Sequence, residues 1–162
     1  MAGILTVMVV RPARVSDAKA INALIVSHAE QDRMLSRSMA DIYENLQTFL
    51  VAEEGRKVVG CCALEVVWAD LAEVKSLAVD GDRHGKGIGR ALVTEALDEA
   101  QELGVSKVFV LTLEPGFFEK LGFVAVSRES LPMKVWSDCA KCPKQQNCDE
   151  TAVIRNLGRS KK

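Results

Sequence analysis

The sequence predicts a mixed α/β (α+β) fold in which one central sheet is flanked by helices. β-rich runs alternate with stretches of helical periodicity along the chain, and a glycine-dense turn separates one strand-like run from the most regular amphipathic stretch. The length of 162 residues fits one domain with a short appendage and is enough to bury a core.

The first half of the chain reads as a strand, two helices and three further strands. Ser16-Asp17 is a helix start, followed by apolar residues at helical spacing, and Ser38 can cap a second, short helix. Glu54-Gly55-Arg56 is a hairpin signal between two β-rich runs. The strands expected in this half are 7–10, 48–53, 57–67 and 71–80.

The second half contains the clearest amphipathic helix. Apolar residues from Ile88 to Leu103 form one stripe with acidic residues largely opposite, and Gly104 ends the helix. The later elements are a strand at 107–113, a short helix at 115–121 opened by proline, and a strand at 123–127. The predicted order is β-α-α-β-β-β-α-β-α-β. The regular pattern ends after Glu129, so we expect a domain at 1–129 and a C-terminal, cysteine-containing extension at 130–162.

The composition of the chain argues against two classes of binding partner, nucleic acids and membranes. The net charge of −1 gives no sequence-wide attraction to nucleic acid or to an anionic membrane, and no apolar run approaches the roughly 18 residues that cross a bilayer. The apolar start lacks a basic leader, so we expect a cytoplasmic protein whose five cysteines are mostly thiols. The expected partner is a small molecule, with a homodimer possible.

The segment from Asp80 to Arg90 carries the strongest functional signal. Gly85, Gly87 and Gly89 lie between a strand and a helix, where tight backbone and a helix N-terminus make a site for phosphate oxygens. The spacing fits neither the dinucleotide fingerprint nor the nucleoside-triphosphate loop. Taken by itself, the loop could also be a flexible connector without a role in binding.

Three segments together resemble the GNAT superfamily of N-acetyltransferases: the strand 72–79, the glycine turn, and Phe117–Phe123. The resemblance implies the GNAT-type mixed sheet, acetyl-CoA as co-substrate, pyrophosphate held by N–H groups of the turn, and pantetheine paired with the strand. His84 departs from the glutamine or arginine often found at its position. Lys86 and Arg90 either add positive charge to the phosphate site or are solvated surface cations. The implied cofactor-binding residues are Leu77, Ala78, Val79, His84, Gly85, Lys86, Gly87, Ile88, Gly89, Arg90 and Phe118.

Acetyl transfer to an amine needs a base, because an ammonium has no lone pair. Glu73 matches the general base of several superfamily members, and on a strand it shares a face with Lys75, Leu77 and Val79. The alternative is an ion pair of Glu73 with Lys75 or a bound structural water. The resemblance implies the Leu77 N–H as oxyanion donor. Phe118 replaces the tyrosine of many members, so the general acid is unassigned, and the single tyrosine, at position 43, is expected to be a packing residue.

The segments 34–38, 73–79 and 131–139 resemble a narrower group, the short N-acetylglutamate synthases of arginine biosynthesis. The acceptor implied is the α-amino group of L-glutamate. A dicarboxylate needs cationic partners, and Arg37, Lys75 and Lys134 are the candidates. Arg37 bracing the two helices is the alternative. Two other functions stay open: acetylation of another amine (a protein N-terminus, lysine, polyamine or other amino acid), and a non-catalytic acyl-CoA sensor.

The cysteines divide into two groups. Cys61 and Cys62 lie in a predicted strand where small buried thiols pack well. Cys139, Cys142 and Cys148 supply three ligands where zinc prefers four, so we expect no metal. A disulfide, free thiols, and a zinc site completed by Asp138 or Asp149 are the alternatives left open.

Overall fold

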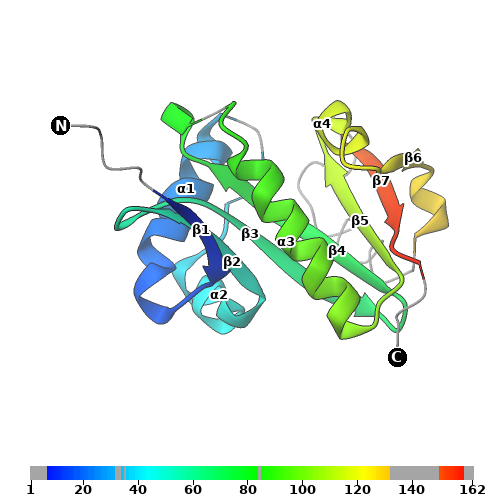
Figure 1. The fold of residues 1–162 in the computed structure, drawn as a ribbon, viewed down its shortest axis with the longest axis horizontal. Helices are drawn as coiled ribbons and strands as arrows, with labels where there is room; N and C mark the ends of the chain where they lie inside the picture. The colour runs from blue at the N-terminus through cyan, green and yellow to red at the C-terminus, as the bar shows by residue number, and fades with distance from the viewer. Residues whose placement is uncertain (1–6, 32–33, 35, 84, 132–149, 159–162) are drawn as a thin grey trace. The chain divides into compact units, whose positions relative to one another are not determined.

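The computed structural model describes residues 7–31, 34, 36–83, 85–131 and 150–158. Within these residues the strands form one mixed sheet in the order β1-β2-β3-β4-β5-β7-β6, with helices packed on it (Figure 1). The elements are β1 Met8–Pro12, α1 Ala18–Glu30, α2 Met39–Glu44, β2 Phe49–Glu54, β3 Lys57–Trp68, β4 Leu71–Val79, α3 Ile88–Leu103, β5 Lys107–Thr112, α4 Pro115–Glu119, β6 Val124–Val126 and β7 Thr151–Asn156. Short 3-10 turns occur at Val15–Asp17, Leu46–Thr48, Gly81–Arg83 and Arg128–Ser130. The predicted order is confirmed from β1 to β6.

Internal contacts divide the chain into two compact units. The first comprises 1–64 and 76–96, and the second comprises 65–75 and 97–162. The elements β3, β4 and α3 each contribute residues to both units.

In the first unit, β1, β2 and β3 pair antiparallel, and α1 and α2 cover one face of them. The core on that face consists of Ala18, Ile21, Ile25, Ile42, Phe49, Val51, Cys61, Ala63 and Ala78. Gly60 faces the other side, where a Cβ would lie 2.9 Å from Ile88 and 3.0 Å from Leu92 of α3. The absence of a side chain at Gly60 therefore lets α3 pack closely on β3.

In the second unit, β4 pairs parallel with β5 from Leu71 to Glu73. β5 continues to Thr112 in antiparallel pairing with β7, which also pairs antiparallel with β6. One core cluster of this unit consists of Val67, Leu71, Phe109, Leu131 and Ala152.

Strand β7 was not expected, because the sequence after Glu129 shows no regular pattern. The strand has only six residues, and Thr151-Ala152-Val153-Ile154 is too short a run to show a clear period. It lies between β5 and β6, and pairing on both edges stabilises it. No helix in the described part of the chain has the length and apolar character needed to cross a bilayer.

Candidate active site

The turn before α3 has the open backbone that the sequence predicts. Gly85 and Gly87 have φ values of +79° and +80°, a conformation that favours glycine, and nothing lies within 4 Å of a Cβ built on either. Ile88 begins α3 and is buried, while Gly85, Lys86 and Gly87 are exposed. The first N–H groups of α3, a helix of 16 residues, therefore lie next to an open, glycine-lined surface.

Cationic side chains flank this turn. Lys86 and Arg90 are exposed and make no ion pair with any residue that the structure describes. His84 lies outside the described residues. The turn combines helix N–H groups, glycine backbone and two cations, which is a chemical environment for phosphate oxygens.

Strand β4 changes direction locally at Ser76. This residue has φ +56° and is the one non-glycine residue with positive φ in the described ranges. A left-handed residue breaks the two-residue period of a strand. The expectation that Glu73 and Lys75 share a face with Leu77 and Val79 is therefore wrong across Ser76, although it holds between Glu73 and Lys75.

The two parts of β4 differ in their surroundings. Glu73 is half-buried and lies opposite Phe109 of β5 in the parallel pairing. Leu77 is also half-buried, whereas Ala78 and Val79 are buried. At the end of the strand, Nε2 of His28 in α1 lies 2.9 Å from the Val79 carbonyl oxygen.

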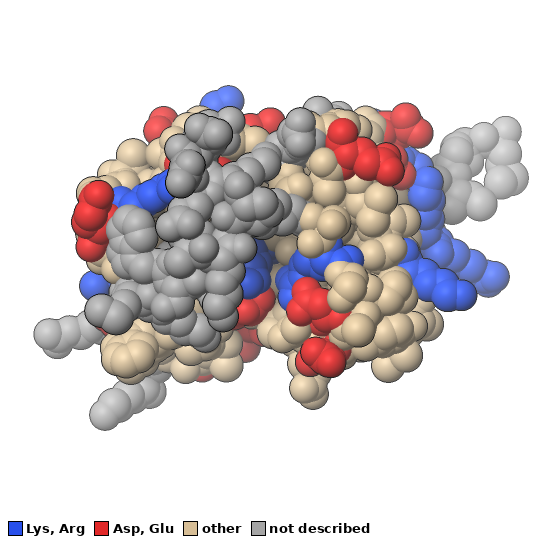
Figure 2. All heavy atoms as spheres, turned by 180° about the vertical axis from the view of Figure 1, so that it is seen from behind, with Lys and Arg blue, Asp and Glu red and all other residues tan. Residues whose placement is uncertain are grey.

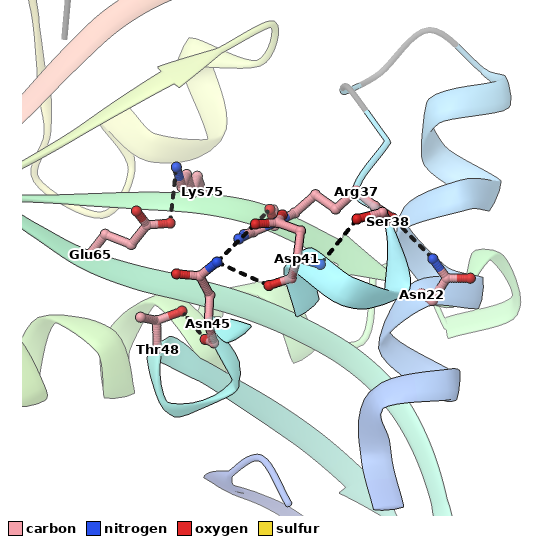
Figure 3. A network of polar contacts seen from close by, with 9 residues as sticks. Asn22, Arg37, Ser38, Asp41, Asn45, Thr48, Glu65 and Lys75 are labelled. Atoms are coloured by element: carbon pink, nitrogen blue, oxygen red, sulfur yellow. Dashed lines mark hydrogen bonds and ion pairs between the residues drawn. The ribbon is translucent and has the colours of Figure 1, made fainter. Parts of the chain in front are cut away.

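Arg37 lies at the centre of a polar network that the first unit builds around the start of α2 (Figure 3). Its Nε donates to Oδ2 of Asp41 at 2.5 Å, and Nη1 donates to the Ser76 hydroxyl at 3.2 Å. Its Cζ lies 5.0 Å from the centroid of the Phe49 ring. Only 11% of the Arg37 side chain is exposed, so the guanidinium is held in a nearly buried, fixed position.

The backbone around Arg37 is held as well. Asn22 of α1 donates to the Arg37 carbonyl at 3.1 Å, and the Ser38 hydroxyl caps α2 by accepting from the Asp41 N–H at 3.0 Å. Asn45 Nδ2 donates to Oδ1 of Asp41 at 2.8 Å. Arg37 thus braces the helices, as one of the two alternatives expected, while it also contacts β4 through Ser76.

Lys75 belongs to the second unit and forms an ion pair there. Its Nζ lies 2.9 Å from Oε2 of Glu65 on β3 (Figure 3). The two side chains are 35% and 25% exposed. The acceptor cation expected at Lys75 is therefore already balanced by a carboxylate from the neighbouring strand.

Phe118 is part of an aromatic cluster. Its ring is buried and meets Phe117 and Phe123 edge-to-face, with ring centroids 4.9 and 5.4 Å away. Tyr43, expected to be a packing residue, is instead 46% exposed on α2. Lys134 and the cysteines at 139, 142 and 148 lie outside the described residues. Within the described ranges no group of three or more His, Cys, Asp or Glu side chains is placed to hold a metal.

Four polar residues of these networks were not singled out in the sequence. Asp41 and Asn45 follow Arg37 at successive four-residue spacings, a helical signal that was available. Glu65 faces Lys75 across a hairpin, so strand pairing was needed to find it. Ser76 gives no local signal, because serine seldom adopts positive φ.

Comparison with known proteins agrees with this fold. The family model described as the acetyltransferase (GNAT) domain matches residues 45–125 of this chain. An uncharacterized N-acetyltransferase of Chlorobaculum tepidum is 44% identical over 148 residues, which are 91% of this chain and 96% of the relative. An amino-acid acetyltransferase of Mycobacterium tuberculosis is 40% identical over 136 residues, covering 82% of this chain and 78% of the relative.

Among solved structures, N-acetylglutamate synthase from Neisseria gonorrhoeae, complexed with coenzyme A and N-acetyl-glutamate, matches with a TM-score of 0.86 and 28% identity. The match covers 94% of this chain and 36% of that longer chain. The family model, the similar relatives and the shared fold together lead to one assignment. The chain belongs to the GNAT family of N-acetyltransferases, which use acetyl-CoA as co-substrate.

Proposed function

We propose that the enzyme transfers the acetyl group of acetyl-CoA to the α-amino group of L-glutamate, the first step of arginine biosynthesis, in the cytoplasm. The observation that carries this proposal is the nearly buried Arg37 guanidinium, fixed by Asp41 and Ser76 immediately before Leu77. A cation held in this way suits a carboxylate and repels an ammonium. The similarity to an N-acetylglutamate synthase and to an amino-acid acetyltransferase supports the same acceptor class.

The donor is proposed to bind through the turn and the end of β4. The pyrophosphate accepts hydrogen bonds from N–H groups between Gly85 and Arg90, and Lys86 adds charge. The pantetheine arm pairs with backbone groups of Leu77, Ala78 and Val79. The left-handed Ser76 supports pairing at Leu77, because a break in the strand period interrupts regular pairing next to it. The backbone N–H and carbonyl oxygen of Val79 already lie within hydrogen-bond distance of His28 Nε2.

The proposed chemistry begins with Glu73 accepting a proton from the α-ammonium of glutamate, directly or through water. The neutral amine then attacks the thioester carbonyl carbon, and the Leu77 N–H donates to the oxygen that becomes negative. Collapse of this intermediate breaks the carbon–sulfur bond; the nitrogen gives up its second proton to form the amide, and the departing thiolate takes up one proton and leaves as the thiol of coenzyme A. No described residue is assigned to supply that proton.

The carboxylates of glutamate are proposed to contact Arg37 and Lys75, with Lys134 as a third candidate. Both described cations already have a carboxylate neighbour, Asp41 and Glu65 respectively. Each cation is therefore held within its own unit before the substrate arrives, which reduces the ordering cost of binding.

The acceptor assignment is tested by steady-state kinetics with glutamate, glutamine and spermidine. Arg37→Ala should lower kcat/KM for glutamate by about ten- to a hundredfold, since each lost charge-assisted hydrogen bond is worth roughly 1.5–3 kcal/mol. The KM for acetyl-CoA should change little. Lys19→Ala, which removes an exposed cation on α1 outside both proposed sites, is the control. Spermidine as the best substrate, with Arg37→Ala indifferent to glutamate, would refute the assignment.

Another amine or amino acid is the alternative acceptor. The 44% identical relative is an uncharacterized N-acetyltransferase, so that similarity supports the donor and the reaction class alone. Another amino acid or amine would share the donor site and Glu73 but would not need Arg37. The same kinetic comparison separates the two proposals.

A further inference from the structure

The first unit contains a cavity of about 700 Å³ whose lining shares one residue, Val79, with the proposed donor site. It is bounded by α1, the end of β1, the β2–β3 hairpin and the residues that follow β4. Its volume lies in the range of small-molecule sites, roughly 300–1,000 Å³. Among the described residues of the donor turn, 85–90, none lines it.

One stripe of α1 forms part of the cavity lining. Ala20, Ala23, Leu24 and Ser27 recur at helical spacing along this stripe, and Val58 of β3 also lines the cavity. Three of the four helical side chains are small, which leaves room above the helix. This part of the cavity offers apolar contact to a ligand.

Basic side chains outnumber acidic ones in the cavity lining. Four line the cavity, and two of them already have carboxylate partners: Arg11 lies 2.8 Å from Asp17 and 3.0 Å from Glu53, and Lys57 lies 3.1 Å from Asp80. These three carboxylates are the acidic residues of the lining, so each is already paired.

The other two cations, Arg14 and Arg56, form no ion pair with a residue in the described part of the chain. Both are exposed, one before α1 and the other in the β2–β3 turn. A concave surface with surplus positive charge attracts anions, and the planar guanidinium fork binds oxyanions in particular.

We propose that this cavity is a second ligand site, for a small molecule that carries a carboxylate or phosphate group. Arg14 and Arg56 bind the anionic group, and the apolar part of the ligand packs on Ala20, Ala23 and Leu24. The site is separate from the donor turn and does not depend on which amine is acetylated.

The test is isothermal titration of the full chain with inorganic phosphate and with butyrate, in saturating coenzyme A so that the donor turn is filled. At least one probe should bind, and the double variant Arg14→Ala/Arg56→Ala should raise its Kd at least tenfold. The matched control, Lys19→Ala/Lys120→Ala, removes the same charge from exposed positions outside the cavity and should leave the Kd unchanged.

The relative affinities identify the anionic group as phosphate or carboxylate. Thermal melts of both double variants establish that they are folded, which the exposed positions favour. The proposal is overturned if neither probe binds, if the Arg14/Arg56 variant binds like wild type, or if both double variants weaken binding equally. Binding of both probes only when coenzyme A is absent would assign them to the donor site and would also overturn it.

Discussion

Ser76 has an unfavourable backbone conformation and forms hydrogen bonds with two neighbouring side chains. A left-handed serine costs on the order of 1 kcal/mol or more, so neighbouring contacts must hold it. Its hydroxyl accepts from Arg37, and its carbonyl oxygen accepts from the Cys61 thiol at 3.5 Å. Burial raises the pKa of that thiol to about 12, so Cys61 stays protonated and able to donate at neutral pH. Arg37 is thus tied to the residue that sets the direction of the Leu77 N–H.

Replacement of Gly87 tests the donor turn. Gly87→Val adds a branched side chain at φ +80° and at the surface where phosphate oxygens are proposed to approach. Affinity for coenzyme A should fall at least tenfold, or about 1.4 kcal/mol, by titration calorimetry. The control is Gly81→Ala, an exposed glycine without positive φ and with open space around its Cβ. Equal affinity of a folded Gly87→Val variant would remove this site.

Replacement of Glu73 tests the base. Glu73→Gln keeps the size of the side chain but cannot take up the proton, so kcat should fall by roughly a hundredfold or more. Affinity for coenzyme A should be retained, because the proposed role lies in the chemical step. The exposed Glu95→Gln on α3 serves as control. Turnover close to wild type in Glu73→Gln would mean that solvent or another residue takes the proton.

At the scale of secondary-structure elements, the periodicity of apolar residues predicted the longest helix correctly. The pairing of strands that are distant in sequence did not follow from such periodicity. The amphipathic pattern predicted α3 from Ile88 to Leu103 with the observed bounds. β7 was missed because a six-residue strand is stabilised by β5 and β6, which are distant in sequence. The break at Ser76 was missed for a similar reason, since its contacts come from Arg37 and Cys61.

The candidate site divides in the same way. The donor turn was predictable, because glycine spacing between a strand and a helix is a local signal with a physical cause. The partners of the cations were not, since Glu65 meets Lys75 only across paired strands. The sequence pattern therefore identified the charged residues but not the residues with which they form ion pairs.

The packing of α3 on β3 is tested at Gly60. Gly60→Ala places a methyl group 2.9 Å from Ile88 and 3.0 Å from Leu92, so side chains or helix must shift. We expect a loss of about 1–3 kcal/mol in the free energy of unfolding, measured by urea denaturation. Gly116→Ala in α4 has open space around its Cβ and should be neutral or slightly stabilising. Equal stability of the two variants would contradict the close approach at Gly60.

At the scale of the whole molecule, acidic and basic residues nearly balance, with 22 Asp and Glu against 21 Lys and Arg. On the face shown in Figure 2, acidic and basic side chains lie next to each other in several places, and basic side chains gather at the right-hand edge. Hydrogen bonds to the carboxyl groups hold the pKa values of Asp17 and Asp80 below their ordinary range. Acid should therefore weaken the fold by protonating carboxylates that the native state keeps ionised.

Asp17 is the carboxylate at which this dependence on pH is best tested. It is buried, and it accepts hydrogen bonds from both terminal nitrogens of Arg11, at 2.8 and 3.0 Å, and from the Arg14 N–H at 2.7 Å. The hydrogen bonds from Arg11 are the main cause of its lowered pKa. A carboxyl whose pKa is lower in the folded state stabilises the fold above its unfolded pKa of about 3.9, and loses that contribution as pH falls through the folded value.

Asp17→Asn should therefore destabilise the protein by about 2 kcal/mol at pH 7, because it removes the charge and at least one hydrogen-bond acceptor. The difference from wild type should persist at pH 5 and shrink steadily below pH ~4, as wild-type Asp17 itself becomes protonated. Urea denaturation of both proteins at pH 7, 5 and 3 measures this. Asp98→Asn, an exposed position on α3, should change stability by less than about 0.5 kcal/mol at pH 7. A penalty for Asp17→Asn that is equally large at pH 3 and pH 7 would show that the loss is steric rather than electrostatic.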